Sequence, residues 1–304
     1  MTERELSFHG PRGMRLAGTL CVPPRADDDL PVAAVLLCQG LSGVKHLVLP
    51  EVADRLSSHG FASLRFDYAG YGDSDGDRGW IDPRARVADA AHALERLAAH
   101  EAVDEARLGA YGHSLGGPVA IALAARESRV RAVVSVSGPG SGVDLLRSLR
   151  PSWEWIEFKR RVREARERRA STGDGTPVAL DEIFPFSPEF RARYEELKRR
   201  GGSSAIAAGD ELGTSRFYLE TVDAIVDFHP EDEVRRLGDC PLLLVHGEDD
   251  DVAPVETVEP VYANAPQTKR WHVLPGLGHN ELDSEPGLTA ALEQAANWFS
   301  HYLR

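Results

Sequence analysis

Short apolar runs separated by amphipathic stretches constrain the fold of this chain more than any other feature of its sequence. The run Val32–Cys38 is apolar throughout, and Leu242–Val245 is a second such run. Continuous apolar runs of this length are typical of strands that are buried on both faces of a parallel sheet. Between the runs, stretches such as Arg84–His100 carry apolar residues at helical spacing. Repeated strand–helix units predict an α/β fold, with a mostly parallel central sheet covered by helices on both faces.

The expected elements alternate along the chain after an opening antiparallel hairpin. The hairpin joins Arg4–Phe8 to Met14–Val22 through the turn Gly10–Gly13. Further strands are expected at Val32–Cys38, Phe61–Phe66, Ala106–Tyr111, Val130–Val136, Pro241–Val245 and Arg270–Leu274. Helices are expected at Pro50–His59, Arg84–His100, Leu115–Arg126 and Gly287–Leu303.

Residues 144–220 differ from the rest of the chain in charge and in pattern. The whole chain has 35 Lys and Arg against 48 Asp and Glu, a net charge of −13, whereas this segment has 15 against 14. Its aromatic stretch Trp153–Phe158 leads into a long charged stretch of helical character, and loops rich in glycine and serine interrupt it. We interpret residues 144–220 as a helical insertion in an α/β core that is formed by residues 1–143 and 221–304.

Composition argues against several classes of protein. A net charge of −13 disfavours nucleic acid as the main partner. The cysteines Cys21, Cys38 and Cys240 are far apart and form no Cys-x-x-Cys pair, so we expect neither a disulfide framework nor a metal site. No apolar run approaches the roughly 18 residues of a membrane span, and the charged N-terminus lacks the apolar core of a secretory signal. We therefore expect a cytoplasmic protein with no membrane partner.

The pentapeptide Gly112–Gly116, of the form Gly-x-Ser-x-Gly, lies directly between an expected strand and an expected helix. A turn this tight needs glycine at both flanks, because a Cβ atom there would clash with neighbouring backbone. The turn lifts the Ser114 hydroxyl above the sheet edge and beside the helix N-terminus, whose amides favour developing negative charge. This context predicts that Ser114 is a catalytic nucleophile.

A serine nucleophile needs a base and an acid, and after a turn of this kind the chain order is serine, acid, histidine. His279 lies on a glycine-rich loop after the last expected strand, and we predict that it is the base. His246 lies too close to the end of its strand, and His113 is expected to point away from the serine. The consecutive aspartates Asp249–Asp251 follow the preceding strand, and the residues alone leave the acid open among the three.

The loop Gln39–Gly43, after the first buried strand, is the candidate for stabilising an oxyanion. Acyl transfer by a serine needs two backbone N–H groups aimed at the carbonyl oxygen of the substrate. One belongs to the residue after the nucleophile, which is Leu115, and the other comes from this loop. Gly40 allows close approach of the backbone, so Leu41 is the second candidate donor.

Together these motifs resemble the α/β-hydrolase superfamily over nearly all of the chain outside residues 144–220. The resemblance rests on Gln39-Gly40-Leu41, Phe66–Ser74, Gly112–Gly116, Gly247–Asp250 with Pro254, and Gly278-His279. It implies that Asp250 is the acid, because the acid of this family falls in a Gly-x-x-Asp-x-x-x-Pro pattern. The family usually has His-Gly at the oxyanion loop, and Gln39 departs from that pattern.

More narrowly, the chain is similar to dienelactone-hydrolase-like and prolyl-peptidase-like bacterial hydrolases, which include polyketide-tailoring acyltransferases. Dienelactone hydrolases proper have a cysteine where this chain has Ser114. The resemblance also implies that residues 144–220 form a cap over the active site. The basic residues between Lys159 and Arg169 either attract a coenzyme A or carrier-protein thioester or form a solvated helix with interleaved glutamates, and we favour the helix.

Aromatic residues of the expected cap are candidates for an acyl pocket, although most of them could instead form the core of the cap itself. We predict pocket roles for Trp153, Trp155, Phe158 and Phe217. The larger aromatic set also includes Phe184, Phe186, Phe190 and Tyr218.

The expected function is hydrolysis of a carboxylic ester or thioester of a small-molecule acyl substrate, without a metal or an organic cofactor. Three alternatives stay open. They are an acyltransferase with the same triad, an amidase or peptidase, and a binding protein on a hydrolase scaffold. A homodimer stays open as an alternative to a monomer.

Overall fold

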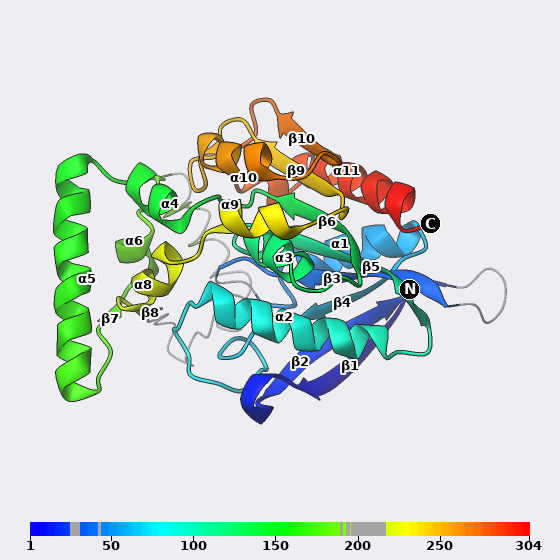
Figure 1. Cartoon of the computed structure of the whole chain (residues 1–304), viewed down its shortest axis with the longest axis horizontal. Coiled ribbons are helices and arrows are strands. Elements are labelled where there is room, and N and C mark those ends of the chain that lie inside the picture. Colours follow the sequence, from blue (N-terminus) through cyan, green and yellow to red (C-terminus); the bar gives the residue numbers. More distant parts are fainter. Residues whose placement is uncertain (25–30, 42–43, 189–190, 193–194, 196–216) are drawn as a thin grey trace.

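The central feature of the computed structural model is a sheet of eight strands in the order β1-β2-β4-β3-β5-β6-β9-β10 (Figure 1). The structure describes residues 1–24, 31–41, 44–188, 191–192, 195 and 217–304. The strands are β1 (Thr2–His9), β2 (Arg15–Val22), β3 (Val32–Cys38), β4 (Ala62–Phe66), β5 (Val103–His113), β6 (Val130–Val136), β9 (Leu242–Gly247) and β10 (Lys269–Leu274). Each expected strand is present, and the predicted α/β fold is confirmed.

The direction of the strands brings several loops to one edge of the sheet. β2 runs antiparallel to both β1 and β4, and all the remaining neighbours pair in parallel. β3 lies between β4 and β5 and is buried from Ala33 to Cys38, as its apolar sequence predicts. Because the carboxyl ends of parallel strands meet at the same edge, the loops after β3, β5, β9 and β10 come together there.

Helices cover both faces of this sheet. On one face pack α1 (Leu49–Ser58) and α11 (Gly287–Tyr302), whose apolar residues share one core cluster with the sheet. The other face carries α2 (Pro83–Ala98), α3 (Gly116–Ala124), α9 (Pro230–Glu233) and α10 (Glu259–Asn264) (Figure 1). α2 begins where expected because the Asp82 side chain accepts hydrogen bonds from the amides of Arg84 and Ala85, and Pro83 occupies the first turn.

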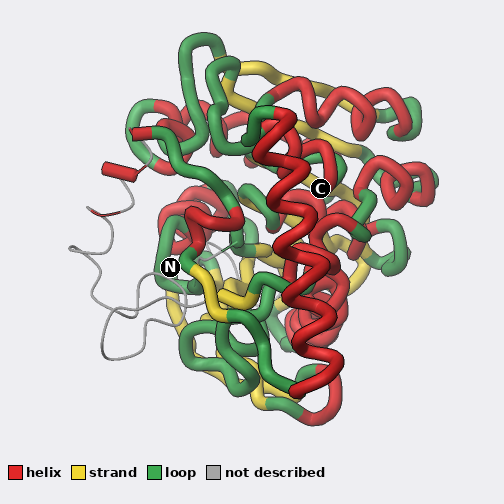
Figure 2. Tube along the Cα trace, turned by 90° about the vertical axis from the view of Figure 1, so that its left-hand side faces the viewer, coloured by secondary structure: helices red, strands yellow, loops and turns green. Residues whose placement is uncertain are grey.

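The described segment between β6 and α9 lies to one side of the core (Figure 1). It contains α4 (Gly142–Ser148), α5 (Ser152–Thr172), β7 (Pro177–Val178), α6 (Leu180–Ile183), β8 (Phe217–Tyr218) and α8 (Thr221–Val226). α5 is the long helix expected after Trp153, and in Figure 2 it stands in front of the α/β core. The pairing of β7 with β8 was not expected from the sequence, so this segment is not purely helical.

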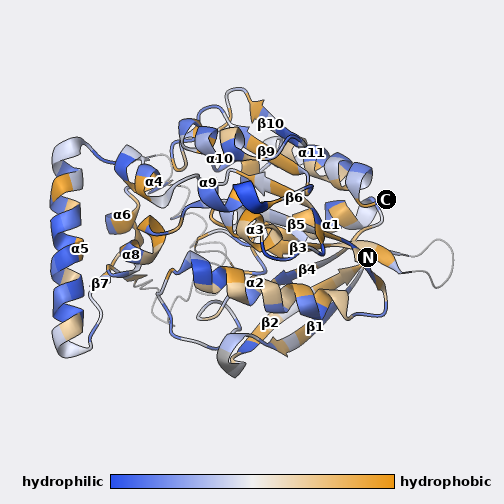
Figure 3. Cartoon of the chain, viewed as in Figure 1, coloured by the Kyte–Doolittle hydropathy of each residue, from blue (hydrophilic) through white to orange (hydrophobic). Residues whose placement is uncertain are grey.

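α5 buries only a narrow stripe of its surface. Trp155, Phe158, Val162 and Ala165 are buried, at spacings of three and four residues. The rest of the helix is largely hydrophilic, as the blue colour of α5 in Figure 3 shows. Within the described residues, no helix is both long and apolar enough to cross a membrane.

Candidate active site

The turn between β5 and α3 holds Ser114 in an unusual backbone conformation. Ser114 has a φ of 51°, in the left-handed region that residues with a Cβ atom rarely adopt. The flanking glycines make room for this turn. A Cβ atom on Gly112 would lie 2.0 Å from the carbonyl oxygen of Gly116, and one on Gly116 would lie 2.1 Å from that of Cys38. Strain of this kind is characteristic of functional sites, where the surrounding structure holds it in place.

His279 connects Ser114 to Asp250 through both of its ring nitrogens. Its Nε2 lies 3.1 Å from Ser114 Oγ, and its Nδ1 lies 2.8 Å and 3.1 Å from the two oxygens of Asp250. His279 and Asp250 are each only 5% exposed. With the proton on Nδ1, His279 donates to Asp250 and leaves Nε2 free to accept the proton of the Ser114 hydroxyl.

Asp250 is the member of the aspartate triplet that meets the imidazole, whereas Asp249 and Asp251 are exposed. Its Oδ1 accepts hydrogen bonds from the backbone amides of Val252 at 3.0 Å and Ala253 at 2.7 Å. Burial favours the protonated form of Asp250, but His279 and His246 outweigh it and hold the pKa of this carboxyl well below its usual range. Asp250 is therefore ionised at neutral pH.

His246, at the end of β9, is a second neighbour of the Asp250 carboxylate. Its Nε2 lies 3.4 Å from Asp250 Oδ2 and 2.7 Å from the carbonyl oxygen of Ala253. The sequence did not predict this contact. His246 belongs to the end of β9 and lies four residues before Asp250, which follows on the loop after that strand. His246 therefore helps to fix the carboxylate rather than contacting Ser114.

The electrostatic surroundings of His279 favour its protonated form. Burial lowers the pKa of His279, but the nearby Asp250 carboxylate more than offsets burial, and Asp283 and Asp251 add to the same effect. The net result is a pKa above the ordinary value of 6.5. An imidazole with a raised pKa is a stronger base, which suits removal of a proton from a serine hydroxyl.

Leu41 and Leu115 face the same cavity as Ser114. Within the described part of the chain, no group accepts a hydrogen bond from the backbone N–H of either leucine. The amide of Gly40, by contrast, donates to the Gln39 side-chain oxygen at 2.7 Å. The two free amides are thus available to a ligand beside Ser114.

Gln39 takes a structural position that the sequence did not reveal. Its side-chain nitrogen donates to the carbonyl oxygens of Val44 at 3.0 Å and Leu47 at 2.5 Å, which ties the chain just after β3 to residues 44–47. Gln39 is buried, so the amide reaches these partners without competition from water. Gln39, which departs from the His-Gly pattern that the resemblance led us to expect, therefore has a structural role at the end of β3.

His113 lies in the site, and the expectation that it points away from Ser114 was wrong. It lines the cavity beside Ser114, and its ring centroid is 5.6 Å from that of His279. Its Nε2 is 2.8 Å from Oδ1 of Asp283, which also lines the cavity. Asp283 was missed in the sequence, although it lies only four residues after His279. The site thus holds a second histidine–carboxylate pair.

The cavity above Ser114 has a volume of about 140 Å³ and an apolar wall. Leu145 of α4, Ile225 of α8, and Leu180, Phe184 and Phe186 from the α6 region form this wall. The polar residues that line the cavity are Gln39, His113, Ser114, His279, Asn280 and Asp283.

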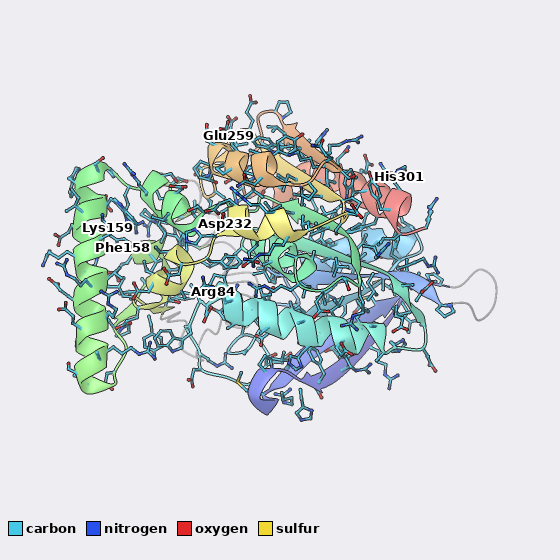
Figure 4. All side chains as sticks on the ribbon, in the orientation of Figure 1. Arg84, Phe158, Lys159, Asp232, Glu259 and His301 are labelled. Carbon is cyan, nitrogen blue, oxygen red and sulfur yellow. The ribbon has the colours of Figure 1, made fainter. Side chains whose placement is uncertain are left out.

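The four predicted pocket residues do not belong to this cavity as the described residues define it. Trp153 is 72% exposed, while Trp155, Phe158 and Phe217 are buried in the hydrophobic core. Phe158 lies on α5 (Figure 4), and its ring centroid is 3.8 Å from the guanidinium of Arg150. α5, which carries Trp153, Trp155 and Phe158, lies on the outer side of this segment (Figure 1). Of the larger aromatic set, Phe184 and Phe186 reach the cavity, Tyr218 stacks on Trp80 with ring centroids 4.7 Å apart, and Phe190 lies outside the described residues.

Three of the seven basic residues between Lys159 and Arg169 form ion pairs with acids that the structure describes, and one of them, Arg166, lies 3.9 Å from Asp223. Arg160 binds Glu157 and Glu164 on its own helix, and Arg161 binds Glu182 at 2.7 Å. The pairs on α5 itself are of the kind expected for a solvated helix with interleaved glutamates, and the binding of a coenzyme A or carrier-protein thioester stays an alternative. Among the described residues, no group of three or more His, Cys, Asp or Glu side chains is arranged to hold a metal ion.

Three curated relatives are similar to most of this chain. An uncharacterized 31.7 kDa protein of Escherichia coli is 26% identical over 270 residues, which cover 88% of this chain and 91% of that protein. The polyketide transferase claH of Penicillium crustosum is 25% identical over 89% of this chain and 88% of its own length. A thiohydrolase of Eupenicillium brefeldianum is 24% identical over 82% and 80%, respectively.

Solved structures and a family model agree with this fold. A hypothetical protein from Pseudomonas aeruginosa superposes with a TM-score of 0.84 at 21% identity, covering 99% of this chain and 94% of the other. The family model described as serine aminopeptidase, S33, matches residues 29–286. Because that match spans most of the chain, and the sheet carries a tight Gly-x-Ser-x-Gly turn between β5 and α3, the chain belongs to this serine aminopeptidase family of α/β hydrolases and is a hydrolase.

Proposed function

We propose that this protein is a serine hydrolase that cleaves a carboxylic ester or thioester through an acyl-enzyme intermediate. The observation that carries the proposal is the continuous contact from Ser114 Oγ through His279 to Asp250, with distances of 3.1 Å and 2.8 Å. The positive φ of Ser114 and the raised pKa of His279 support the same assignment. Each feature serves nucleophilic attack by a serine hydroxyl.

In the first half of the reaction, His279 Nε2 removes the hydroxyl proton as Ser114 Oγ attacks the acyl carbon. The negative charge that develops on the carbonyl oxygen is held by the N–H groups of Leu41 and Leu115, each worth about 3 kcal/mol in the transition state. His279 then gives its proton to the leaving oxygen or sulfur atom, and the acyl group remains on Ser114. Asp250 stabilises the transient imidazolium.

In the second half, a water molecule replaces the departed alcohol or thiol. His279 removes a proton from the water as its oxygen attacks the acyl carbon, and then returns the proton to Ser114 Oγ. The products are a carboxylic acid and the free serine, so the cycle needs neither a metal nor an organic cofactor.

We further propose that residues 144–220 form a cap that selects the acyl group. Leu145, Leu180, Phe184 and Phe186 come from this segment and line the cavity that contains Ser114. An apolar wall favours an uncharged acyl chain, because burying an unpaired charge there would cost several kcal/mol. The substrate class that fits is an ester or thioester with an apolar acyl group.

Labelling with a fluorophosphonate, followed by mass measurement of the intact chain, tests the proposal. We expect a single adduct on the wild-type chain and none on Ser114→Ala. The exposed Ser58, which is bonded to the carbonyl oxygen of Arg55, provides a matched control, and Ser58→Ala is expected to label like the wild type. A folded wild-type chain that takes up no label, or a Ser114→Ala variant that labels equally, would contradict the proposal.

Acyl transfer is the second candidate, and the likeness to a polyketide transferase favours it. The same acyl-enzyme would then react with an alcohol or amine instead of water. Product analysis with and without an added acceptor separates the two reactions, because a transferase yields a new ester or amide while a hydrolase yields only the acid. Parallel assays with esters and anilides test the amidase alternative.

A further inference from the structure

We propose that Arg86 is a positioning residue that fixes the direction of the Leu41 N–H, and with it the oxyanion-binding geometry beside Ser114. This inference rests on the proposed function, in which the Leu41 amide stabilises the oxyanion. Arg86 lies on α2, far from the catalytic loops in sequence, and no motif in the chain singles it out.

Arg86 binds the two consecutive carbonyl groups of the oxyanion loop. Its Nη1 donates to the carbonyl oxygen of Gly40 at 2.9 Å, and its Nη2 donates to that of Leu41 at 2.5 Å. The planar guanidinium presents its N–H groups in a fixed fork, so the two bonds set both the position and the tilt of this stretch of backbone. A single N–H donor would leave the loop free to rotate about one bond.

The geometry of the peptide bond carries this restraint to the Leu41 amide. The carbonyl of Gly40 and the N–H of Leu41 belong to the same peptide unit, which is planar and trans, so the two groups point in opposite directions. When Arg86 draws the Gly40 oxygen to one side, the Leu41 N–H must face the other side. Gly40 and Leu41 line the cavity with Ser114, and a Cβ atom on Gly40 would lie only 3.2 Å from Ser114 Cβ.

The guanidinium is itself held in place. Arg86 is 3% exposed, and its Cζ lies 4.8 Å from the ring centroid of Tyr68 and 4.7 Å from that of Tyr71. Cation–π contacts with two tyrosine rings favour arginine, whose flat guanidinium stacks where an ammonium cannot. Tyr71 is anchored in turn, since its hydroxyl donates to the carbonyl oxygen of Trp80 at 3.1 Å.

Other residues hold the remainder of the loop, so the contribution of Arg86 can be separated from folding. Gln39 bonds Val44 and Leu47. Lys45 is fully buried, and Asp67 accepts from its backbone amide at 2.6 Å and from its ammonium group at 3.2 Å. These contacts fix both ends of the loop independently of Arg86. Loss of the Arg86 fork should therefore disturb the Gly40–Leu41 peptide rather than the fold.

The test compares Arg86→Lys and Arg86→Met with Arg84→Lys and Arg84→Met. Arg84 is a matched control, because it is an exposed arginine of the same helix that also donates to a backbone carbonyl, that of Asp227 at 2.5 Å. The readouts are kcat and KM for a p-nitrophenyl ester, the affinity for an alkyl boronic acid that forms a tetrahedral adduct on serine, and the pH midpoint of kcat. Each kcat is calculated per active site, and the concentration of active sites is measured by titration with a fluorophosphonate. Misfolded protein therefore does not lower the apparent kcat.

For Arg86→Lys we expect kcat to fall about 10- to 100-fold, which approaches the loss of one oxyanion donor. The affinity for the boronic acid should fall by the same factor, while KM, the pH midpoint of kcat and the melting temperature stay near wild-type values. A purely structural role would not produce a parallel loss of kcat and of boronic acid affinity at an unchanged pH midpoint. For Arg86→Met, kcat and the affinity for the boronic acid should fall at least as much. For the Arg84 variants, both quantities should stay within about twofold of the wild type.

Either of two results would overturn the inference. One is an Arg86→Lys enzyme whose titrated sites keep kcat and boronic acid affinity within about twofold of the wild type. The other is a loss that appears in KM or in the pH midpoint instead of kcat. Failure of the proposed function looks different, because the wild-type chain would then show no turnover that depends on Ser114.

Discussion

Replacing Asp250 by asparagine removes the charge behind His279 while preserving the shape of the side chain. The His279 Nδ1 lies 2.8 Å from Asp250 Oδ2. Unit charges about 4 Å apart attract by about 4 kcal/mol at an effective dielectric constant of about 20. Loss of this stabilisation from the imidazolium corresponds to about a 10³-fold lower kcat. The asparagine amide can also donate to Nδ1, which would move the ring proton to Nε2 and bring the loss to about 10⁴-fold.

Turnover of p-nitrophenyl butyrate measures this effect, with the melting temperature from circular dichroism as the check on folding. The asparagine oxygen can still accept from the amides of Val252 and Ala253, so the loop is expected to keep its shape. Asp249→Asn is the control, and it should stay within about twofold of the wild type because this carboxylate is exposed and screened. A folded Asp250→Asn enzyme that keeps kcat within tenfold would refute this reasoning.

Three further predictions follow from the same geometry. Because catalysis needs neutral His279, whose pKa is raised, kcat/KM should rise with pH through a midpoint above 6.5, and a midpoint at or below that value in a pH–rate profile would contradict the assignment. Lys45→Met should lower the free energy of unfolding in urea by about 3 kcal/mol, since it leaves the buried Asp67 carboxylate without its cation, and an unchanged unfolding midpoint would argue against that pairing. Phe184→Ala should favour longer acyl chains by roughly tenfold in kcat/KM, whereas Trp153→Ala, at an exposed site, should leave the chain-length profile unchanged; equal profiles for both variants would count against Phe184 as part of the pocket wall.

The proposed site also indicates how hydrolysis and acyl transfer can share one fold. Among the polar residues that line the cavity, His113 and Asp283 lie close to His279 and offer polar groups to water or another acceptor. The apolar residues of the cavity suit the acyl chain of the proposed substrate. Whether water or another acceptor receives the acyl group then depends on which of them these polar residues bind, because the proposed triad is the same in both reactions.

The strands, helices and tight turns that are set by residues adjacent in the sequence could be predicted from the sequence alone. The apolar run Val32–Cys38 predicted a buried strand, and the glycines around Ser114 predicted a tight turn between strand and helix. Both follow from local rules of burial and backbone sterics, which need no knowledge of distant residues. The expected chain order of serine, acid and histidine pointed to the loops after the last two strands for the acid and the base that serve Ser114. These loops lie near Ser114 because the carboxyl ends of parallel strands share one edge of the sheet.

Side-chain directions, by contrast, were decided only by the tertiary structure. Which carboxylate of the triplet faces His279 depends on how a loop folds over β9, and His113 turned toward the cavity although the sequence suggested the opposite. The wall of the cavity is formed by Leu180 and Phe184 rather than the aromatic residues of α5, because α5 packs on the outer side of its segment. Arg86 reaches Gly40 across a long separation in sequence. Contacts of this kind depend on the packing of whole elements against one another, which no local pattern of residues encodes.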